Sequence, residues 1–112
     1  MSISLIVYPV TDLAAAKPIY RELLGIDPYV DEPYYVGFRT GDREVGLDPN
    51  GHKKAPGPIA YREVSDIKTS LQQLIDAGAQ PHLDVTDVGG GKLIALVKDG
   101  DGNVIGISQS PW

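Results

Sequence analysis

The stretch Leu5–Pro28, LIVYPVTDLAAAKPIYRELLGIDP, decides the fold because a related stretch, IAYREVSDIKTSLQQLIDAGAQP, occurs again at Ile59–Pro81. An offset of 54 residues aligns Asp12 with Asp66, and a helical pattern follows each aspartate. Two copies of one unit each bury an apolar face, and the seam between such units is a natural place for a pocket. The sequence therefore predicts two similar modules with a groove at their seam.

The two copies also end alike, with REVGLDP at 43–49 and NVIGISQ at 103–109, so that Gly46 aligns with Gly106. Between the copies lies PNGHKKAPGP, which is rich in turn-forming residues and lacks any periodicity, as is typical of a linker. We therefore expect a single domain over residues 1–112. It should contain a first module at about 1–49, a linker at 50–58 and a second module at about 59–112.

The first module is predicted to have the order β-α-β-β-β. Residues 3–8 favour a strand, Thr11 and Asp12 offer side-chain caps, and Pro18 is expected in the first turn of a helix that Gly25 ends. The apolar stripe of this helix consists of Ile19, Tyr20, Leu23 and Leu24. Further strands are expected near 28–31, at 34–39 and at 43–48.

The second module repeats this order. Asp66 is the predicted N-cap of a helix that ends at Gly78 and has Ile67, Leu71, Leu74 and Ile75 at helical spacing. Its strands are expected at 59–64, 81–86, 92–98 and 103–109. The predicted fold class is α+β, in which two βαβββ modules form a curved mixed sheet with a groove, and the helices cover its outer face.

Composition excludes several classes of function. The chain has 112 residues, of which 42% are hydrophobic, and a net charge of −5. An acidic protein is poorly suited to nucleic acid or an anionic membrane, because both attract basic surfaces. The absence of cysteine excludes disulfides, thiolate nucleophiles and thiolate metal sites. With neither a signal peptide nor a long apolar segment evident, a soluble cytoplasmic protein is expected.

The module order resembles the vicinal oxygen chelate superfamily, which includes glyoxalase I, extradiol dioxygenases, fosfomycin-modifying enzymes and bleomycin resistance proteins. The resemblance covers nearly the whole chain. Its motifs are the Asp-Leu pair near the first helix, Leu-Gly-Ile at 24–26, and Asp-Gly-Asn-Val-Ile-Gly at 101–106. It implies the two-module fold described above.

The resemblance also implies where metal ligands would lie. Metal-dependent members carry a ligand, often His, in each first strand and a Glu or Gln in each last strand. The matching positions here are Leu5, Ile59, Gly46 and Gly106. None of these residues offers a nitrogen, oxygen or sulfur side-chain donor, and a shift of the alignment by one residue restores no ligand set. We therefore expect no metal and no cofactor.

Alternation along the strands indicates which residues would line the groove. If the ligand positions face the groove, their neighbours two residues away face it too. The predicted ligand-binding residues are Leu5, Val7, Gly46, Asp48, Ile59, Tyr61, Glu63, Gly106 and Ser108. The two glycines are expected to leave room at the floor. Such a lining suits a flat or apolar organic ligand with one cationic group, although the same apolar residues also suit a packed core.

Other candidates are weaker. Tyr29, Tyr34 and Tyr35 cluster beside an acidic stretch and suit a ligand contact, an interface or ordinary packing equally. His52 lies in the linker, and His82 with Asp84 makes a poor metal pair. The run Gly89-Gly90-Gly91 precedes a strand rather than a helix, so it predicts a flexible loop or flap and no phosphate site.

Three functions remain open on this basis. The first is a metal-free protein of the bleomycin-resistance type that sequesters a small organic molecule and catalyses nothing. The second is a glyoxalase-like lyase or isomerase with Glu63, Glu44 or Tyr61 as general base. The third is a dimeric interaction module with a vestigial pocket. The resemblance also implies a homodimer, because family members of this length usually assemble in pairs, and the excess of tyrosine and tryptophan is compatible with it.

Overall fold

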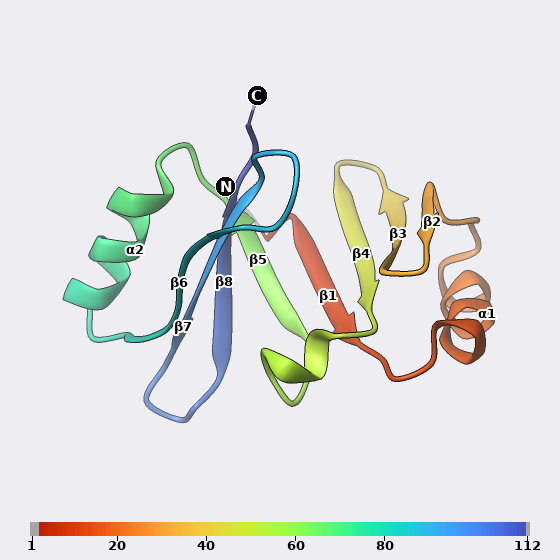
Figure 1. Ribbon diagram of the computed structural model, residues 1–112, viewed down its shortest axis with the longest axis horizontal. Coiled ribbons are helices and arrows are strands. Elements are labelled where there is room, and N and C mark those ends of the chain that lie inside the picture. The colour runs from red at the N-terminus through yellow and green to blue at the C-terminus, as the bar shows by residue number, and fades with distance from the viewer. Residues whose placement is uncertain (1–2, 112) are drawn as a thin grey trace. The chain divides into compact units, whose positions relative to one another are not determined.

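The computed structural model describes residues 3–111, and its chain separates into two compact units (Figure 1). The first unit is Ser4–Ala60, here called the N-terminal module. The second contains the chain from Tyr61 onward and is called the C-terminal module. Each unit combines a helix with strands of a mixed sheet, which confirms the predicted α+β class.

The N-terminal module contains β1 (Leu5–Pro9), α1 (Leu13–Leu24), β2 (Val30–Glu32), β3 (Tyr35–Thr40) and β4 (Arg43–Asp48). Its strands lie in the order β2-β3-β4-β1. Strand β1 pairs with β4 in parallel, and the other pairs are antiparallel. A short 3-10 helix, η1 (Gly51–Lys53), lies in the segment predicted to be a linker.

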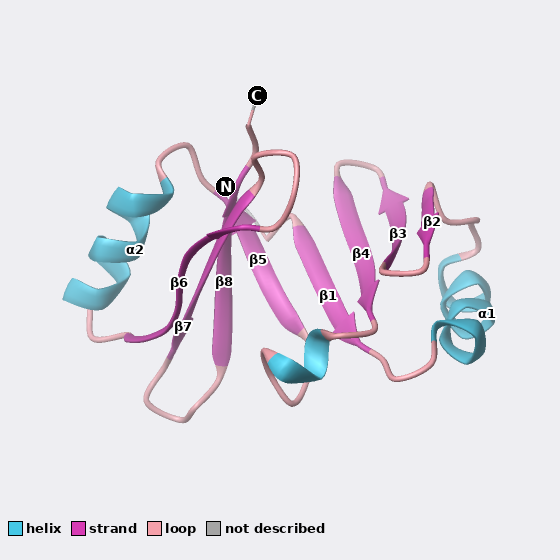
Figure 2. Cartoon of the chain, viewed as in Figure 1, coloured by secondary structure: helices cyan, strands magenta, loops and turns pink. Residues whose placement is uncertain are grey.

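The C-terminal module follows the same plan (Figure 2). Strand β5 (Ile59–Glu63) begins two residues before the boundary and leads into α2 (Ile67–Asp76). Strands β6 (Gln80–Asp87), β7 (Leu93–Lys98) and β8 (Val104–Gln109) complete the order β5-β8-β7-β6. Strands β5 and β8 are parallel, so both modules place their first and last strands side by side.

Both helices begin at the predicted aspartates. The Asp12 carboxylate accepts a hydrogen bond from the Ala15 amide at 3.3 Å, and Asp66 accepts one from the Thr69 amide at 3.2 Å. These bonds satisfy amides that lack a partner within the helix. Gly25 ends α1 with φ 70, a left-handed conformation that glycine adopts at little cost.

The predicted position of Pro18 is wrong. Helix α1 begins at Leu13, so Pro18 lies inside the helix and not in its first turn. The missing proline amide removes one hydrogen bond from the helix interior. The cap at Asp12 sets the start of the helix, and packing of residues on both sides of Pro18 against the core maintains it.

Each helix covers one face of its half of the sheet. Helix α1 packs on a cluster of Val36, Phe38 and Leu47, and α2 packs on Ala95, Val97 and Ile107. The predicted stripe of α1 is only half correct, because Tyr20 and Leu24 contact this core whereas Ile19 and Leu23 are 66% and 71% exposed. The opposite face, called the helix-free face of each module, carries the alternate residues of the same strands. Within residues 3–111, no helix is long and apolar enough to cross a membrane.

Candidate functional site

The N-terminal module brings its predicted site residues to one place. Leu5 pairs with Glu44 and Val7 with Gly46 in the parallel register of β1 and β4. Because side chains alternate along a strand, these residues share the helix-free face with Asp48. The core residues Val45 and Leu47, which lie between them in β4, point to the opposite face and pack beneath α1.

Two glycines form the floor of this face. Gly37 of β3 lies directly opposite Gly46 of β4 in the antiparallel register. A Cβ atom placed on Gly46 would lie 2.7 Å from ring atoms of Tyr35, and one on Gly37 would lie 3.0 Å from Tyr35 Cε2 and 3.1 Å from Tyr29 Cε1. Contacts this close require one group to move. The absence of a side chain at both positions therefore allows Tyr29 and Tyr35 to lie against the backbone.

Both tyrosines are bound to the same carboxylate. The hydroxyl of Tyr29 donates to Oε1 of Glu44, and the hydroxyl of Tyr35 donates to Oε2. The guanidinium of Arg39 lies 4.2 Å from the centre of the Tyr29 ring, within the range of a cation–π interaction. We call Tyr29, Tyr35, Arg39 and Glu44 the tyrosine–carboxylate cluster. Tyr29 is 47% exposed, and both Tyr35 and Glu44 are half-buried, so solvent reaches the cluster.

Both phenols remain protonated at neutral pH. Burial raises the pKa of Tyr35 far above 10, and its hydrogen bond to Glu44 and the nearby charges raise it further. Burial and the hydrogen bond to Glu44 also raise the pKa of Tyr29, although Arg39 opposes this shift. The proton of each hydroxyl is thus held between the phenol oxygen and the Glu44 carboxylate.

Asp48, at the edge of the same face, is already engaged. Its Oδ1 accepts a hydrogen bond from the Asn50 amide at 2.8 Å, and its Oδ2 lies 3.5 Å from Nζ of Lys54. Asp48 therefore stabilises the turn after β4, and its charge is partly neutralised by Lys54.

The C-terminal module repeats the arrangement with a different ring. Tyr61 of β5 pairs with Gly106 of β8, and a Cβ atom on Gly106 would lie 2.9 Å from Cγ of Tyr61. Tyr61 is 4% exposed and Ser108 is 1% exposed. The predicted residues Tyr61, Glu63, Gly106 and Ser108 are therefore neighbours, but they are packed rather than open. Ile59, two residues before Tyr61 in β5, is also buried.

Glu63 is held by serine side chains and backbone. Ser108 Oγ donates to its Oε2 at 2.9 Å, and the Ser110 amide donates to its Oε1 at 2.6 Å. Burial acts to raise the pKa of Glu63, but the hydrogen bonds from Ser110 and Ser108, with the charge of Lys92, outweigh it. The pKa of Glu63 therefore lies below its usual value of 4.5.

The expectation of open space above the two glycines is wrong, because each glycine is covered by a tyrosine ring of its own module. The residues at the family's metal positions also do not fit a metal. Leu5 and Ile59 carry hydrocarbon side chains, and Gly46 and Gly106 carry none. Across the part of the chain that the structure describes, no group of three or more His, Asp or Glu side chains is close enough to hold an ion.

The remaining candidates lie in other elements. His52 lies in η1, and His82 lies in β6. The loop Gly89–Gly91 joins β6 to β7, and all three of its glycines have positive φ.

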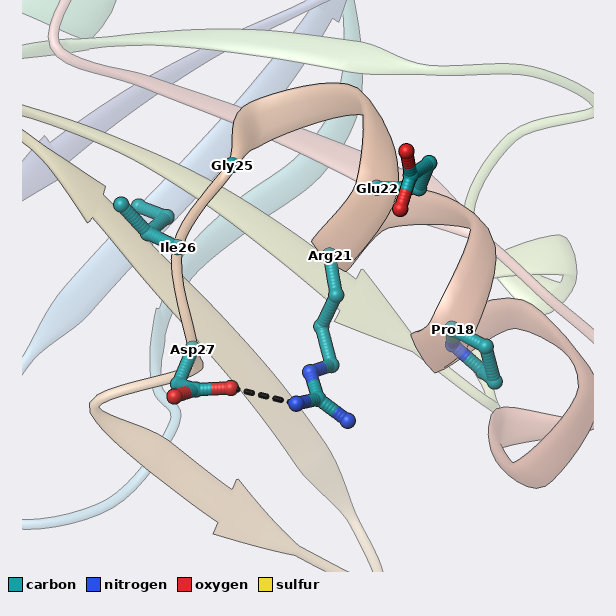
Figure 3. A pocket seen from close by; sticks show the side chains of 6 residues that line it. All are labelled: Pro18, Arg21, Glu22, Gly25, Ile26 and Asp27. Carbon is teal, nitrogen blue, oxygen red and sulfur yellow. Dashed lines mark ion pairs between the residues drawn. The ribbon is translucent and has the colours of Figure 1, made fainter.

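A surface depression of ≈ 510 Å³ lies at the end of α1 and contains none of the predicted residues (Figure 3). The depression is lined by Pro18, Arg21, Glu22, Gly25, Ile26 and Asp27. Arg21 Nη2 and Asp27 Oδ1 form an ion pair of 2.6 Å across it, so its cation already has a partner (Figure 3).

Sequence analysis missed Gly37 and Arg39 and did not assign Tyr29 and Tyr35 to the site. The turn Gly41-Asp42 supplies the signal that would have placed the three residues of β3, whereas Tyr29 precedes β2 and is not reached by it. A two-residue turn pairs Thr40 with Arg43, which places Gly37 opposite Gly46. Alternation then puts Tyr35, Gly37 and Arg39 on one face of β3.

Known proteins share this architecture. A crystal structure from Legionella pneumophila, described as an NAD-dependent benzaldehyde dehydrogenase, has a TM-score of 0.79 at 19% identity, over 94% of this chain and 96% of that chain. Methylmalonyl-CoA epimerase from Mycobacterium tuberculosis has a TM-score of 0.75 at 16% identity, over 97% of this chain and 88% of that chain. A glyoxalase/bleomycin resistance protein/dioxygenase superfamily member from Vibrio splendidus has a TM-score of 0.71 at 15% identity, over 95% of this chain and 97% of that chain. At these identities the likeness shows the fold alone.

No curated protein matches the sequence. The model of the Glyoxalase/Bleomycin resistance protein/Dioxygenase superfamily, however, matches residues 2–107, which is nearly the whole chain. Together with the two βαβββ modules, this match shows that the chain belongs to the Glyoxalase/Bleomycin resistance protein/Dioxygenase superfamily.

Proposed function

We propose that the protein binds a small apolar or aromatic organic molecule without a metal ion, as a sequestering protein of the bleomycin-resistance type, and catalyses no reaction. The observation that carries this proposal is the replacement at Gly46. Where metal-dependent relatives carry a carboxylate ligand, this chain has no side chain, and the Tyr35 ring lies in the space. An aromatic ring offers a surface for a flat ligand but is no ligand for a hard cation.

The carboxylate-base alternative has less support. A general base needs a free oxygen and a pKa near the working pH. Both oxygens of Glu44 accept tyrosine hydroxyls, and both oxygens of Glu63 accept hydrogen bonds from the segment that contains Ser108 and Ser110. The lowered pKa of Glu63 makes it a weaker base still. Neither carboxylate is therefore prepared to take a proton from a carbon acid.

Ligand binding is tested by screening aromatic fragments at millimolar concentration with ligand-observed NMR. We expect hits whose binding is lost in Tyr35→Ala. Tyr34→Ala is the matched control, because Tyr34 adjoins the same strand, is 68% exposed and makes no contact with Glu44 in the described hydrogen bonds. A screen without hits, or hits that both variants retain equally, would contradict the proposal for this face.

We further propose that the chain forms a homodimer, as the resemblance to the superfamily implies. Light scattering at micromolar concentration should then give twice the chain mass of 12.0 kDa. The mass of a single chain would contradict this proposal and would leave the vestigial interaction module without support.

A further inference from the structure

We propose that the tyrosine–carboxylate cluster of the N-terminal module recognises an organic cation with N–H donors, such as an amidinium, guanidinium or ammonium group on a flat body. This inference rests on the proposed function and names the class of ligand. The four side chains of the cluster lie on the helix-free face, and Tyr29 and Tyr35 lie over the glycine pair Gly37 and Gly46.

The hydrogen-bonding capacity of the cluster is one-sided. The hydroxyls of Tyr29 and Tyr35 each have one hydrogen to donate, and both donate it to Glu44. The hydroxyl oxygen of Tyr35 keeps its lone pairs, that of Tyr29 is also a hydrogen-bond acceptor for Arg39, and the carboxylate has only lone pairs. Apart from Arg39, the cluster therefore presents acceptors alone to an incoming molecule. A ligand that satisfies these acceptors must bring N–H or O–H donors.

The charge and the rings favour a donor that is also a cation. Glu44 carries a negative charge that no ion pair within 4.0 Å neutralises among the described residues. The faces of tyrosine rings attract cations, and this attraction strengthens when the cation is partly removed from water. Hydrogen bonds between a cation and a carboxylate are about twice as strong as neutral ones.

The chain itself supplies an example of such a cation. Arg39, which pairs with Glu44 across the two strands, places its guanidinium 4.2 Å from the centre of the Tyr29 ring. A planar cation thus already lies against one ring of the cluster. We infer that Arg39 occupies part of the ligand position and competes with a cationic ligand for the Tyr29 ring.

The unrelated depression at the end of α1 lacks these features. Its Arg21 and Asp27 satisfy each other, and no aromatic residue lines it. Glu22, in that depression, is an exposed carboxylate of the same module. It therefore serves as a control for loss of one negative charge.

Three small molecules of nearly the same shape test the inference: benzamidine, a cation; benzamide, which is neutral; and benzoate, an anion. Titration followed by protein NMR should show benzamidine binding at least tenfold more tightly than either of the others. Glu44→Gln should weaken the binding of benzamidine about tenfold, as expected for loss of a charged acceptor, while Glu22→Gln should leave this binding unchanged. Arg39→Gln should tighten benzamidine severalfold by freeing the Tyr29 ring.

Each contrary result has a distinct meaning. Equal or tighter binding of benzamide or benzoate overturns the cationic class while leaving ligand binding intact. Benzamidine binding that survives Glu44→Gln places the site elsewhere and overturns the inference. Weaker binding in Arg39→Gln shows that Arg39 assists the ligand and overturns the competition. If none of the three molecules binds, the inference fails, whereas the proposed function fails only if the aromatic fragment screen is also empty or gives hits that Tyr35→Ala and Tyr34→Ala retain equally.

Discussion

The two modules replace the same family position in the same way, yet the results differ in accessibility. In the C-terminal module, the ring over Gly106 comes from the adjacent strand β5, and Tyr61 is 4% exposed. In the N-terminal module, the ring over Gly46 comes from β3, and it joins Tyr29 and Glu44 in a cluster that solvent reaches. A glycine at this position of the strand can therefore lie either under a buried ring or under a cluster of polar side chains that solvent reaches.

The largest expected change in stability comes from adding a side chain at Gly106 or at Gly46. Gly106→Leu forces new atoms into the buried Tyr61 ring, so the free energy of unfolding should fall by about 3 kcal/mol, the upper end for overpacking. Gly46→Leu displaces Tyr35, which is half-buried and able to turn toward solvent, so its loss should be nearer about 1 kcal/mol. Urea unfolding of both variants beside wild type measures the difference.

If Gly46→Leu lowered the free energy of unfolding as much as Gly106→Leu, the proposed difference in accessibility between the modules would be wrong. The double variant Gly106→Leu with Tyr61→Ala is the internal control, because removal of the ring should return part of the lost stability. If the double variant is no more stable than Gly106→Leu, contact with Tyr61 is not the cause.

A smaller effect should come from the polar partners of each carboxylate. Ser108 is 1% exposed and donates to Glu63, so Ser108→Ala should cost about 1.5 kcal/mol, as for a hydrogen bond to a charged group. Tyr29→Phe removes a donor to Glu44 where water can replace it, so its cost should stay below about 1 kcal/mol. Equal costs in thermal unfolding would show that the two faces do not differ in accessibility.

The modules should also differ in the pH at which they lose stability. The folded pKa of Glu63 lies below its ordinary value of 4.5, so its contribution is complete above pH 4.5 and is lost as the pH falls through the folded pKa. The folded pKa of Tyr35 lies above 10, so its contribution is complete below pH 10 and is lost as the pH rises beyond it.

Matched variants separate these two contributions. Glu63→Gln should flatten the acid limb of the stability profile and leave the alkaline limb unchanged, and Tyr35→Phe should do the reverse. Melting temperatures from pH 3 to pH 11 measure both limbs. A variant that changed the opposite limb would contradict the assignment of Glu63 and Tyr35.

Much of the fold was predictable because local signals agreed with the repeat. The caps at Asp12 and Asp66, the stop at Gly25 and the turn at Gly41 depend only on neighbouring residues. Pro18 was expected in the first turn because an interior proline removes a helix hydrogen bond, but packing of residues on both sides of it allows α1 to begin at the Asp12 cap and to include Pro18. Expecting Ile19 and Leu23 to be packed failed because helical spacing alone does not decide which part of an apolar stripe is covered.

The strand positions that form the site were predictable, but the side chains that cover the glycines were not. Alternation and the repeat placed Glu44, Gly46 and Asp48 on one face, and the structure brings them together. Which ring would fill the space above each glycine could not be read from strand patterns. Tyr35 reaches Gly46 from the next strand at a diagonal, and that choice depends on side-chain rotamers and on the attraction of Glu44 for the hydroxyl.

The central claim is that this chain binds an organic ligand through tyrosine and carboxylate groups in place of a metal ion. Calorimetric titration of benzamidine, before and after the protein is stripped with a chelator, tests it most directly. We predict the same dissociation constant in both samples and no change when zinc, iron, nickel or manganese is added back. Binding that disappears on stripping and returns with one metal ion per chain would contradict the claim.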